Sequence, residues 1–296
     1  MLDEASHGEL ADSSSAPSRS SFLLDGRHAP ARSTTRVLIT GASGLVGRIV
    51  GPALRDAGID TIGFDRVPVR QGEPGIPTVI GSLTDPAAIR SACEGATHVI
   101  HLAANAAGSA TLADELLEPN ILGLHHVMEQ AVDAGIRKII LASTIQTARH
   151  DASPAAPSLG QQRARNWYAL TKIMAEHAGE MYHDRFGIDV IAVRIGWFLR
   201  SRHDHDAMVR QQAQDAFLAY DDATRFFLAT VTRPWSGFHV LYALSRQADS
   251  DRPTYDLSGS ASLLGHQPMH RYPNGLAFSY RAVKSFRDPR VPSTQR

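Results

Sequence analysis

Tyr168 and Lys172, near the middle of the chain, have the spacing of an acid–base pair. They lie four residues apart within a stretch, 167–186, whose pattern predicts a helix. Positions i and i+4 share one face of a helix, so the two side chains can act together. A free phenol has a pKa of about 10 and is a poor base at neutral pH. A neighbouring ammonium favours the phenolate, and the pair is therefore predicted to remove a proton from an alcohol.

Two hydroxyl residues, Ser143 and Thr144, directly follow the apolar run 139–142. That run predicts a buried strand, and ligands of open α/β sheets bind at the carboxyl ends of the strands. A hydroxyl there can orient a substrate oxygen and stabilise charge on it. A Tyr and a Lys at this spacing also occur by chance on amphipathic helices, so the prediction depends on the hydroxyls and on the glycine turn described next.

A glycine-rich turn, 41–47, joins a predicted strand at 37–40 to a predicted helix at 45–57. Gly41 permits a sharp turn, Gly44 removes a side chain that would block a pyrophosphate, and Gly47 lets the helix pack close to the strand. The free N–H groups of the helix end then face the anion. The spacing G-x-x-G-x-x-G differs from the general G-x-G-x-x-G pattern, and a plain strand-to-helix turn is the alternative. The residues predicted to contact a dinucleotide here are Gly41, Ser43, Gly44, Leu45, Val46 and Gly47.

Asp65 stands 18 residues after Gly47, at the end of a predicted second strand, 60–64. A carboxylate at this place can accept hydrogen bonds from an adenosine ribose. It would also repel the additional phosphate of NADP, which favours NAD as the cofactor. Arg66 argues in the other direction, because a guanidinium pairs well with phosphate. We expect both residues to lie at the cofactor.

Short apolar runs alternate with amphipathic stretches from Arg36 onward, which predicts an α/β fold. The runs are apolar on both faces, as is typical of a parallel sheet covered by helices on each side. The expected class is a Rossmann-like doubly wound parallel sheet with a small C-terminal substrate lobe. Strands are predicted at 37–40, 60–64, 98–102, 138–142, 190–194 and 254–257, and helices at 45–57, 86–93, 120–134, 167–186, 221–231 and 237–245.

Three regions are predicted along the chain. Residues 1–35 are rich in Ser, Ala and charge of both signs and are expected to form a disordered extension. Acidic residues within this segment argue against a signal or transit peptide. Residues 36–196 are expected to form the NAD-binding domain that carries the catalytic residues. Residues 197–296 are expected to form the small substrate-binding lobe and a tail.

Composition excludes several classes of function. The chain of 296 residues has 30 basic and 30 acidic side chains, so its balance gives no reason to expect nucleic acid or an anionic membrane as a partner. No apolar run reaches the roughly 18 residues needed to span a bilayer. The single cysteine, Cys93, cannot form an internal disulfide, is expected in the core, and favours a cytoplasmic location. The run 203–206 alternates His and Asp in an expected loop, but without a third converging ligand we predict no metal site.

Taken together, these residues resemble the extended short-chain dehydrogenase/reductase family, the NAD-dependent epimerase/dehydratase group. The resemblance is carried by the turn 40–47, Asp65, the segment 101–104, Asn120, Ser143 with Thr144, and Tyr168 with Lys172. Within the group, the short C-terminal portion and the segments 120–124, 193–196, 220–222 and 264–268 look most like uronate dehydrogenases. Those enzymes oxidise the anomeric carbon of a hexuronic acid with NAD.

The resemblance implies roles for individual residues. Thr144, Tyr168 and Lys172 would be the catalytic set, with Tyr168 as base and Lys172 also bonding the nicotinamide ribose. The further residues that the family places at the cofactor are Ser82, Leu83, Leu102, Ala103, Ala104, Asn105, Asn120, Ser143 and Ile195. The substrate would meet Asn105, Thr144, Ile145, Trp197 and Arg202.

Several positions depart from the family's pattern. Ser82 stands where an Asp usually binds the adenine. Ile145 and Gln146 replace the Asp-Glu pair of the sugar-nucleotide dehydratases, so dehydration loses its acid and base. In uronate dehydrogenases the positions of Ile145 and Trp197 hold a substrate-binding Asn and Ser. A carboxylate-binding Arg is expected shortly after Gly196, and Arg200, Arg202 and Arg210 are the candidates.

The sequence thus predicts an NAD-dependent oxidoreductase that takes hydride from a hydroxyl of a sugar or sugar acid. Two alternatives stay open. One is an NAD-dependent epimerase of sugars or nucleotide sugars, and the other is a dinucleotide-binding sensor without catalysis. The family also implies a homodimer in which the helices at 120–134 and 167–186 form a four-helix interface.

Overall fold

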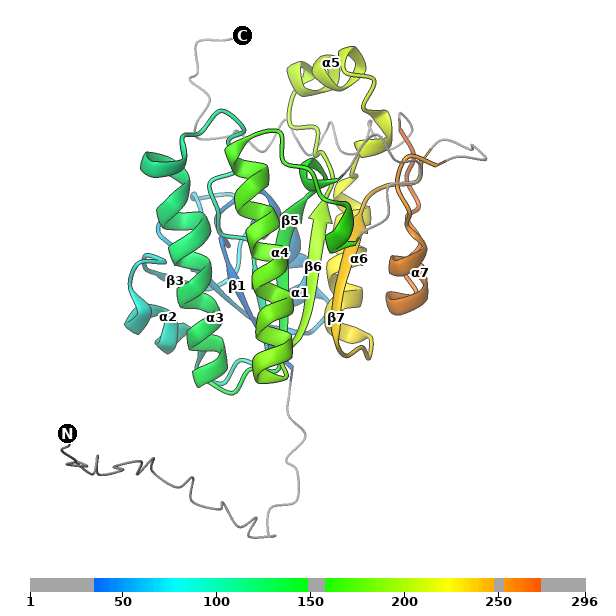
Figure 1. The fold of residues 1–296 in the computed structure, drawn as a ribbon. Helices are drawn as coiled ribbons and strands as arrows, with labels where there is room; N and C mark the ends of the chain where they lie inside the picture. Colours follow the sequence, from blue (N-terminus) through cyan, green and yellow to red (C-terminus); the bar gives the residue numbers. More distant parts are fainter. Residues whose placement is uncertain (1–34, 149–157, 248–252, 273–296) are drawn as a thin grey trace, which may run out of the picture. The chain divides into compact units, whose positions relative to one another are not determined.

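A computed structural model of the chain describes residues 35–148, 158–247 and 253–272. The predicted N-terminal extension and the C-terminal tail lie outside these ranges. The element order is a repeated alternation of strand and helix (Figure 1). No helix among the described residues is both long enough and apolar enough to pass through a membrane.

A seven-stranded sheet forms the centre of the molecule, and all its neighbouring strands are parallel. In chain order the strands are β1 (Arg36–Thr40), β2 (Asp60–Asp65), β3 (Thr78–Ile80), β4 (His98–His101), β5 (Lys138–Thr144), β6 (Asp189–Ile195) and β7 (Phe238–Ala243). Their spatial order is β3-β2-β1-β4-β5-β6-β7. The order reverses direction between β1 and β4, which is the switch point where such sheets bind ligands.

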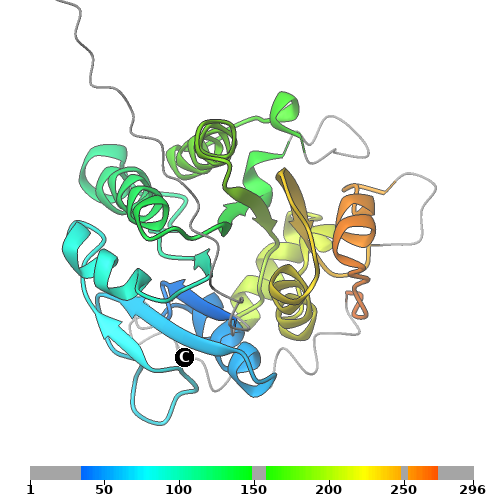
Figure 2. The same ribbon diagram turned by 90° about the horizontal axis from the view of Figure 1, so that it is seen from below.

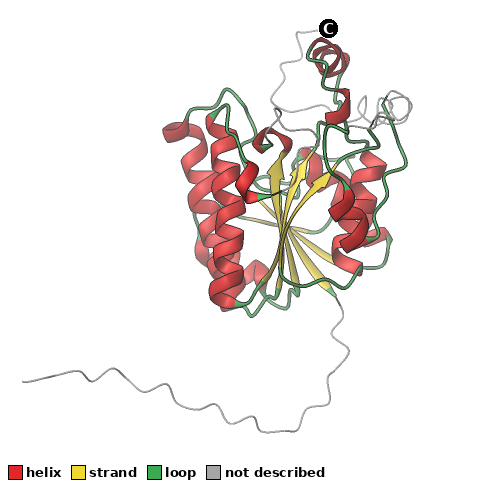
Figure 3. Cartoon of the chain, turned by 45° about the vertical axis from the view of Figure 1, so that its right-hand side comes forward, coloured by secondary structure: helices red, strands yellow, loops and turns green. Residues whose placement is uncertain are grey.

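Helices cover both faces of the sheet, as Figures 2 and 3 show. They are α1 (Leu45–Asp56), α2 (Pro86–Cys93), α3 (Gly123–Asp133), α4 (Trp167–Phe186), α5 (Arg202–Arg210), α6 (Tyr220–Thr232) and α7 (Ser258–Leu264). Side chains of α1, α6 and α7 form one core with the sheet, and side chains of α2, α3 and α4 form the other. The predicted Rossmann-like doubly wound α/β fold is therefore confirmed.

Local sequence explains where several of these elements begin and end. Helix α2 begins at Pro86 because Asp85 accepts hydrogen bonds from the N–H groups of Ala87 and Ala88. Helix α4 is capped by Asn166, which accepts from Ala169 N at 2.7 Å, and it ends at Gly187 in the left-handed conformation. Cys93 is buried in the core, as expected.

Two predicted elements of the C-terminal part are wrong. The segment expected to be a helix at 237–245 is strand β7, parallel to β6. A short apolar run cannot be assigned to strand or buried helix by periodicity alone. No strand forms at 254–257. The side chain of Gln247 instead satisfies Tyr255, accepting from its N–H at 2.7 Å and donating to its carbonyl at 2.6 Å.

Two other boundaries differ from expectation. The helix predicted from Asn120 is preceded by a π-helical segment, η1 (Leu112–Leu122), so Asn120 lies inside a helical stretch rather than at its start. The His-Asp run expected in a loop belongs to α5, which begins at Arg202 because the Ser201 side chain accepts from Asp204 N at 3.1 Å.

Candidate active site

Thr144, Tyr168 and Lys172 come together at the carboxyl end of the sheet. Thr144 is the last residue of β5, while Tyr168 and Lys172 lie one turn apart near the start of α4. The Thr144 side chain lies near enough to the Tyr168 oxygen to lower the pKa of that phenol. Lys172 Nζ lies 6.0 Å from the centre of the Tyr168 ring. Tyr168 and Lys172 are 8% and 4% exposed, so both groups face an environment from which most water is excluded.

Burial dominates the electrostatics of this trio. It raises the pKa of the Tyr168 phenol to about 12, although the hydrogen bond with Thr144 acts in the opposite direction. Burial also lowers the pKa of the Lys172 ammonium to about 8. The expectation of a phenol acidified by Lys172 is therefore not met by the protein alone, because desolvation by burial is the largest cause of the shift.

His101, the last residue of β4, lies near enough to Lys172 for the two side chains to interact electrostatically. Its pKa is lowered to about 3, first by burial and then by the charge of Lys172. The ring is held by Thr40, whose Oγ1 is 2.7 Å from Nδ1. Among the described residues the Lys172 ammonium has no hydrogen-bond partner. A buried donor that lacks a protein partner is suited to bond a ligand hydroxyl at this place.

The glycine turn after β1 forms a cradle in which side chains would not fit. Gly41 has φ of +74°, and a Cβ on it would lie 2.6 Å from Ala103 N. A Cβ on Gly47 would lie 2.3 Å from the carbonyl of Gly41. Helix α1 then begins after Gly44 with no side chain capping it, so its first N–H groups face the cleft. This arrangement fits the pyrophosphate of a dinucleotide.

Asp65 closes the turn from the side of β2. Its carboxylate accepts hydrogen bonds from Ser43 N at 2.9 Å and from Val67 N at 3.2 Å. Asp65 therefore lies beside the glycine cradle, as predicted from the sequence. Arg66 is exposed on the turn that follows. A carboxylate next to an anion-binding turn can accept hydrogen bonds from the hydroxyls of an adenosine ribose.

The segment after β4 is fixed against the glycine turn and α4. Asn120 accepts from Asn105 N at 2.8 Å and donates to Asn105 O at 3.0 Å and to Thr171 Oγ1 at 3.0 Å. Ala103 N approaches Thr40 Oγ1 at 3.4 Å. Asn120 thus holds the 102–105 segment against η1 and α4 beside the switch point.

Ser143 differs from its predicted place at the cofactor. Its hydroxyl donates to Glu176 Oε1 at 2.5 Å, so the side chain points toward α4. Glu176 also accepts from Thr147 at 3.2 Å and from Arg194 Nε at 2.9 Å. This Glu176–Arg194 centre was not predicted from the sequence. An acidic residue one turn after Lys172 and an arginine inside an apolar strand were the available signals.

Other predicted cofactor residues lie around the same edge. Ser82 follows β3, and its hydroxyl lies 2.7 Å from that of Thr84. Leu83 packs against Gly123 at the start of α3, and His126 Nδ1 lies 2.7 Å from its carbonyl. Ile195 is the last residue of β6, opposite Thr144 in the register.

The residues predicted for the substrate separate into two groups. Ile145 directly follows Thr144 and packs on a cluster that contains Ala216 and Tyr255. Asn105 is linked to α4 through the hydrogen bonds of Asn120. Trp197 instead packs with Met208, Phe217 and Tyr272. Arg202 is exposed at the start of α5 and lines neither of the two pockets below, so the structure does not bring it to the trio.

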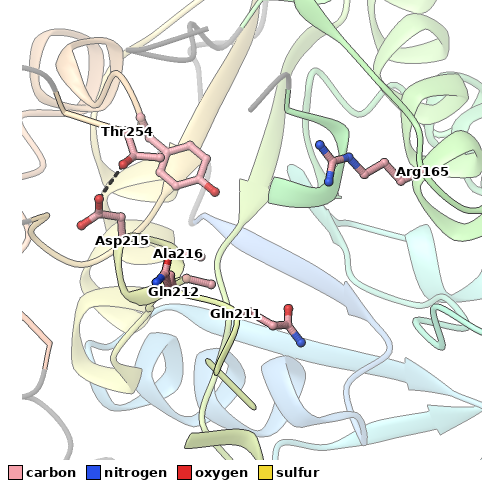
Figure 4. Close-up of a pocket in the computed structure, with 8 residues that line it drawn as sticks. Arg165, Gln211, Gln212, Asp215, Ala216 and Thr254 are labelled. Atoms are coloured by element: carbon pink, nitrogen blue, oxygen red, sulfur yellow. Dashed lines mark hydrogen bonds between the residues drawn. The ribbon is translucent and has the colours of Figure 1, made fainter. Parts of the chain in front are cut away.

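Two pockets lie on this side of the sheet. One, of about 280 Å³, adjoins Asp65 and is lined by Ser43, Arg48, Val67, Pro68, Arg70 and Glu73. The other, of about 340 Å³, is lined by Arg165, residues 211–213, Asp215, Ala216, Thr254 and Tyr255 (Figure 4). The first is lined by residues that follow β1 and β2, and the second by the loop before α4 together with the segments 211–216 and 254–255.

One group in the described part of the chain has ligand atoms close enough for a metal, Asp221, Asp222 and His270. Asp222 already accepts from Met269 N at 2.7 Å, from His270 N at 3.1 Å and from Ser245 Oγ at 2.7 Å. These bonds join the last described segment to α6, and they give the cluster a structural role.

Comparisons with known proteins agree with this geometry. The family described as NAD dependent epimerase/dehydratase matches residues 37–215. An NAD-dependent glucose-6-phosphate dehydrogenase of Haloferax volcanii is 29% identical over 78% of this chain and 92% of its own length. A uronate dehydrogenase of Pseudomonas putida is 29% identical over 79% of this chain and 83% of its own. The crystal structure of uronate dehydrogenase from Agrobacterium tumefaciens superposes with a TM-score of 0.67, at 24% identity, over 88% of this chain and 92% of that one.

Proposed function

The chain belongs to the NAD-dependent epimerase/dehydratase family, and we propose that it is an NAD-dependent dehydrogenase that oxidises a CH–OH group of a sugar or sugar acid. The observation that carries the proposal is the buried trio of Thr144, Tyr168 and Lys172 at the carboxyl end of the strands. It lies beside a glycine cradle and the carboxylate of Asp65, in a chain whose curated relatives are NAD-dependent sugar dehydrogenases.

Separate residues of the chain bind separate parts of the cofactor. Asp65 binds the adenosine ribose, and the N–H groups after Gly41 bind the pyrophosphate. The ammonium of Lys172 donates hydrogen bonds to the nicotinamide ribose. It is available for this because it has no hydrogen-bond partner among the described residues. Bound NAD supplies the hydride acceptor of the reaction.

Thr144 and Tyr168 act on the substrate hydroxyl. Thr144, whose side chain lies near the Tyr168 oxygen, orients the sugar oxygen. The deprotonated Tyr168 oxygen accepts the proton of the sugar hydroxyl as the carbon loses hydride. Burial keeps the phenol protonated in the protein alone. The positive charge brought by the oxidised nicotinamide opposes this effect, so the phenolate becomes accessible when the cofactor is bound.

We also propose the division of the chain predicted from its sequence. Residues 36–196 bind the cofactor and carry the trio, and residues 197–296 supply the substrate-binding part. The 340 Å³ pocket supports this division, because most of its lining comes from residues beyond 210. We propose a cytoplasmic location, supported by the single buried cysteine.

An apolar stripe on α4 supports a homodimer. Trp167, Leu170, Met174 and Met181 are 37–51% exposed and follow the spacing of one helix face. Leu117 and Leu122 of η1 are 42% and 45% exposed, and η1 packs against α4. A second copy would cover this surface and form a four-helix interface. Light scattering should give twice the chain mass, and Met174→Lys with Met181→Lys should return the monomer.

The function is tested by incubating the purified protein with NAD and a panel of aldoses, hexuronates and sugar phosphates while NADH absorbance is recorded. Accumulation of NADH in proportion to consumed sugar supports the proposal. An epimerase would change the sugar without net NADH, and a sensor would bind NAD with no turnover of any sugar; either result would refute it.

A further inference from the structure

The 340 Å³ pocket is related to the catalytic trio through shared packing contacts. Ala216 and Tyr255 in its wall belong to the apolar cluster on which Ile145 packs, and Ile145 directly follows Thr144. On the other side, Asn166 Nδ2 donates to Gln146 Oε1 at 2.9 Å, which fixes the loop before α4 against the end of β5. A sugar with one hydroxyl at Tyr168 would therefore extend toward this pocket. Its volume lies at the small end of the range for ligand sites, about 300–1,000 Å³.

Arg165 is the cation of this pocket. It lies three residues before Tyr168, and Figure 4 shows it across the pocket from Asp215 and Thr254. Its guanidinium forms no hydrogen bond or ion pair with any residue in the described part of the chain. Asp215, in contrast, accepts from Thr254 Oγ1 at 2.5 Å. The pocket thus has one engaged carboxylate and, on the opposite wall, a guanidinium whose donors suit carboxylate or phosphate oxygens.

Gln212 adds a second polar group at a backbone conformation that favours glycine. It is the one non-glycine residue with positive φ among the described residues, at +52°, and it ends α5. Gln212 N donates to Val209 O at 3.1 Å and Ala213 N donates to Met208 O at 3.0 Å, which is a helix end that normally carries Gly. The glutamine at this position adds a side-chain amide to the pocket lining, which a glycine would not do.

We propose that this pocket binds the anionic end of the sugar substrate, with Arg165 as the ligand of its carboxylate or phosphate and with Gln212 and Asp215 facing its hydroxyl groups. The inference rests on the proposed dehydrogenase function and narrows it to anionic sugars. It assigns the discrimination between substrates to the loop before α4 rather than to the arginines after Gly196, because none of Arg200, Arg202 and Arg210 lines the pocket.

The test compares Arg165→Ala, Arg165→Lys and the parent enzyme on a hexuronate, on a hexose 6-phosphate and on the matching neutral hexose. The control is Arg233→Ala, which removes an equally exposed charge at the opposite end of the sheet, just before β7. Arg165→Ala should lower kcat/KM about 10- to 100-fold on the preferred anionic sugar, mainly through KM, because charge-assisted bonds of this size are lost. Its kcat/KM on the neutral hexose should stay within about twofold, and Arg165→Lys should recover part of the loss.

The two anionic sugars distinguish carboxylate recognition from phosphate recognition. A pocket that binds carboxylates favours the hexuronate, and a pocket that binds phosphates favours the hexose 6-phosphate. Equal losses on neutral and anionic sugars, or no greater loss than for Arg233→Ala, would overturn the inference while leaving the dehydrogenase function intact. If no sugar yields NADH, the proposed function fails, and thermal shift decides the pocket separately. A stabilisation by hexuronate or 6-phosphate that disappears in Arg165→Ala supports it, and an unchanged melting temperature with both ligands overturns it.

Discussion

The carboxylate of Glu176 and the guanidinium of Arg194 form an ion pair that is closed to solvent, with Oε2 and Nη2 2.8 Å apart. The pair, on α4 and β6, connects four elements, because Glu176 also accepts from Ser143 near the end of β5 and Arg194 donates to Tyr242 of β7 at 3.2 Å. It therefore fixes the helix that carries Tyr168 and Lys172 against the strand that ends in Thr144. Removing one charge of such a pair leaves the other buried without compensation.

Glu176→Gln should accordingly lower the free energy of unfolding by about 3–5 kcal/mol, measured in urea. Asp133→Asn is the matched control, because its partner Arg90 lies 3.4 Å away and both side chains are more than half exposed. That control should change stability by less than about 1 kcal/mol. Equal effects of the two substitutions would show that the buried pair does not organise this region.

Acid should destabilise the protein through its buried histidines. Burial lowers the pKa of His101 to about 3 and those of His98 and His266 to about 4. In the unfolded chain these histidines bind protons with a pKa of about 6.5. Between pH 6.5 and 4 the unfolded state therefore holds more protons than the native state. The free energy of unfolding falls as pH falls through that window.

His101→Asn should flatten this dependence, since an amide retains a partner for Thr40 but does not titrate. Urea unfolding across the same pH range measures the slope for both proteins. An unchanged slope would exclude His101 as a contributor.

Lys172 should make the protein more stable in mild alkali. Its native pKa of about 8 lies below the unfolded value of about 10.4, so the unfolded chain binds more protons between these pH values and stability rises with pH there. Lys172→Met should abolish this rise and, at neutral pH, raise the free energy of unfolding by on the order of 3 kcal/mol. The same variant should bind NAD more weakly. A variant that is less stable than the parent at pH 7 would contradict the assigned burial cost.

Asp65 should determine the choice between NAD and NADP. Its carboxylate lies against the glycine turn, held by Ser43 N and Val67 N. Asp65→Asn removes the charge and keeps the shape, so KM for NAD should rise about 10-fold while KM for NADP falls. Steady-state kinetics with both cofactors measure the ratio, and Arg66→Ala tests whether the exposed guanidinium contributes to NADP use. A ratio unmoved by Asp65→Asn would remove this residue from the cofactor site.

The cofactor half of the site was predictable because its signals are local. The glycines, Asp65 and the Tyr168–Lys172 spacing are each fixed by position relative to a strand or helix, and alternating apolar runs predicted the sheet that brings them together. The strand β5 is two residues longer than predicted, which places Thr144 inside the sheet.

The substrate half depends on contacts that the sequence does not encode locally. Arg165 and Asp215 are 50 positions apart and meet across a pocket that is otherwise lined by residues 211–213, 216, 254 and 255. The segment 238–243 resembles a buried helix as much as a strand, and its misassignment concealed the wall on which Tyr255 packs. The pKa of Tyr168 was likewise expected to fall, because a sequence pattern shows the neighbouring charge but not the depth of burial.

The central claim is that the Tyr168 oxygen takes the proton of the sugar hydroxyl, and Tyr168→Phe tests it most directly. The substitution removes the hydroxyl and keeps the ring that packs with Ala110 and Leu116. NADH formation with the preferred sugar and NAD binding by calorimetry should be measured on the same preparation. We predict that kcat falls by about 10²–10⁴ while the dissociation constant of NAD changes by less than about threefold. Turnover equal to that of the parent enzyme would contradict the account.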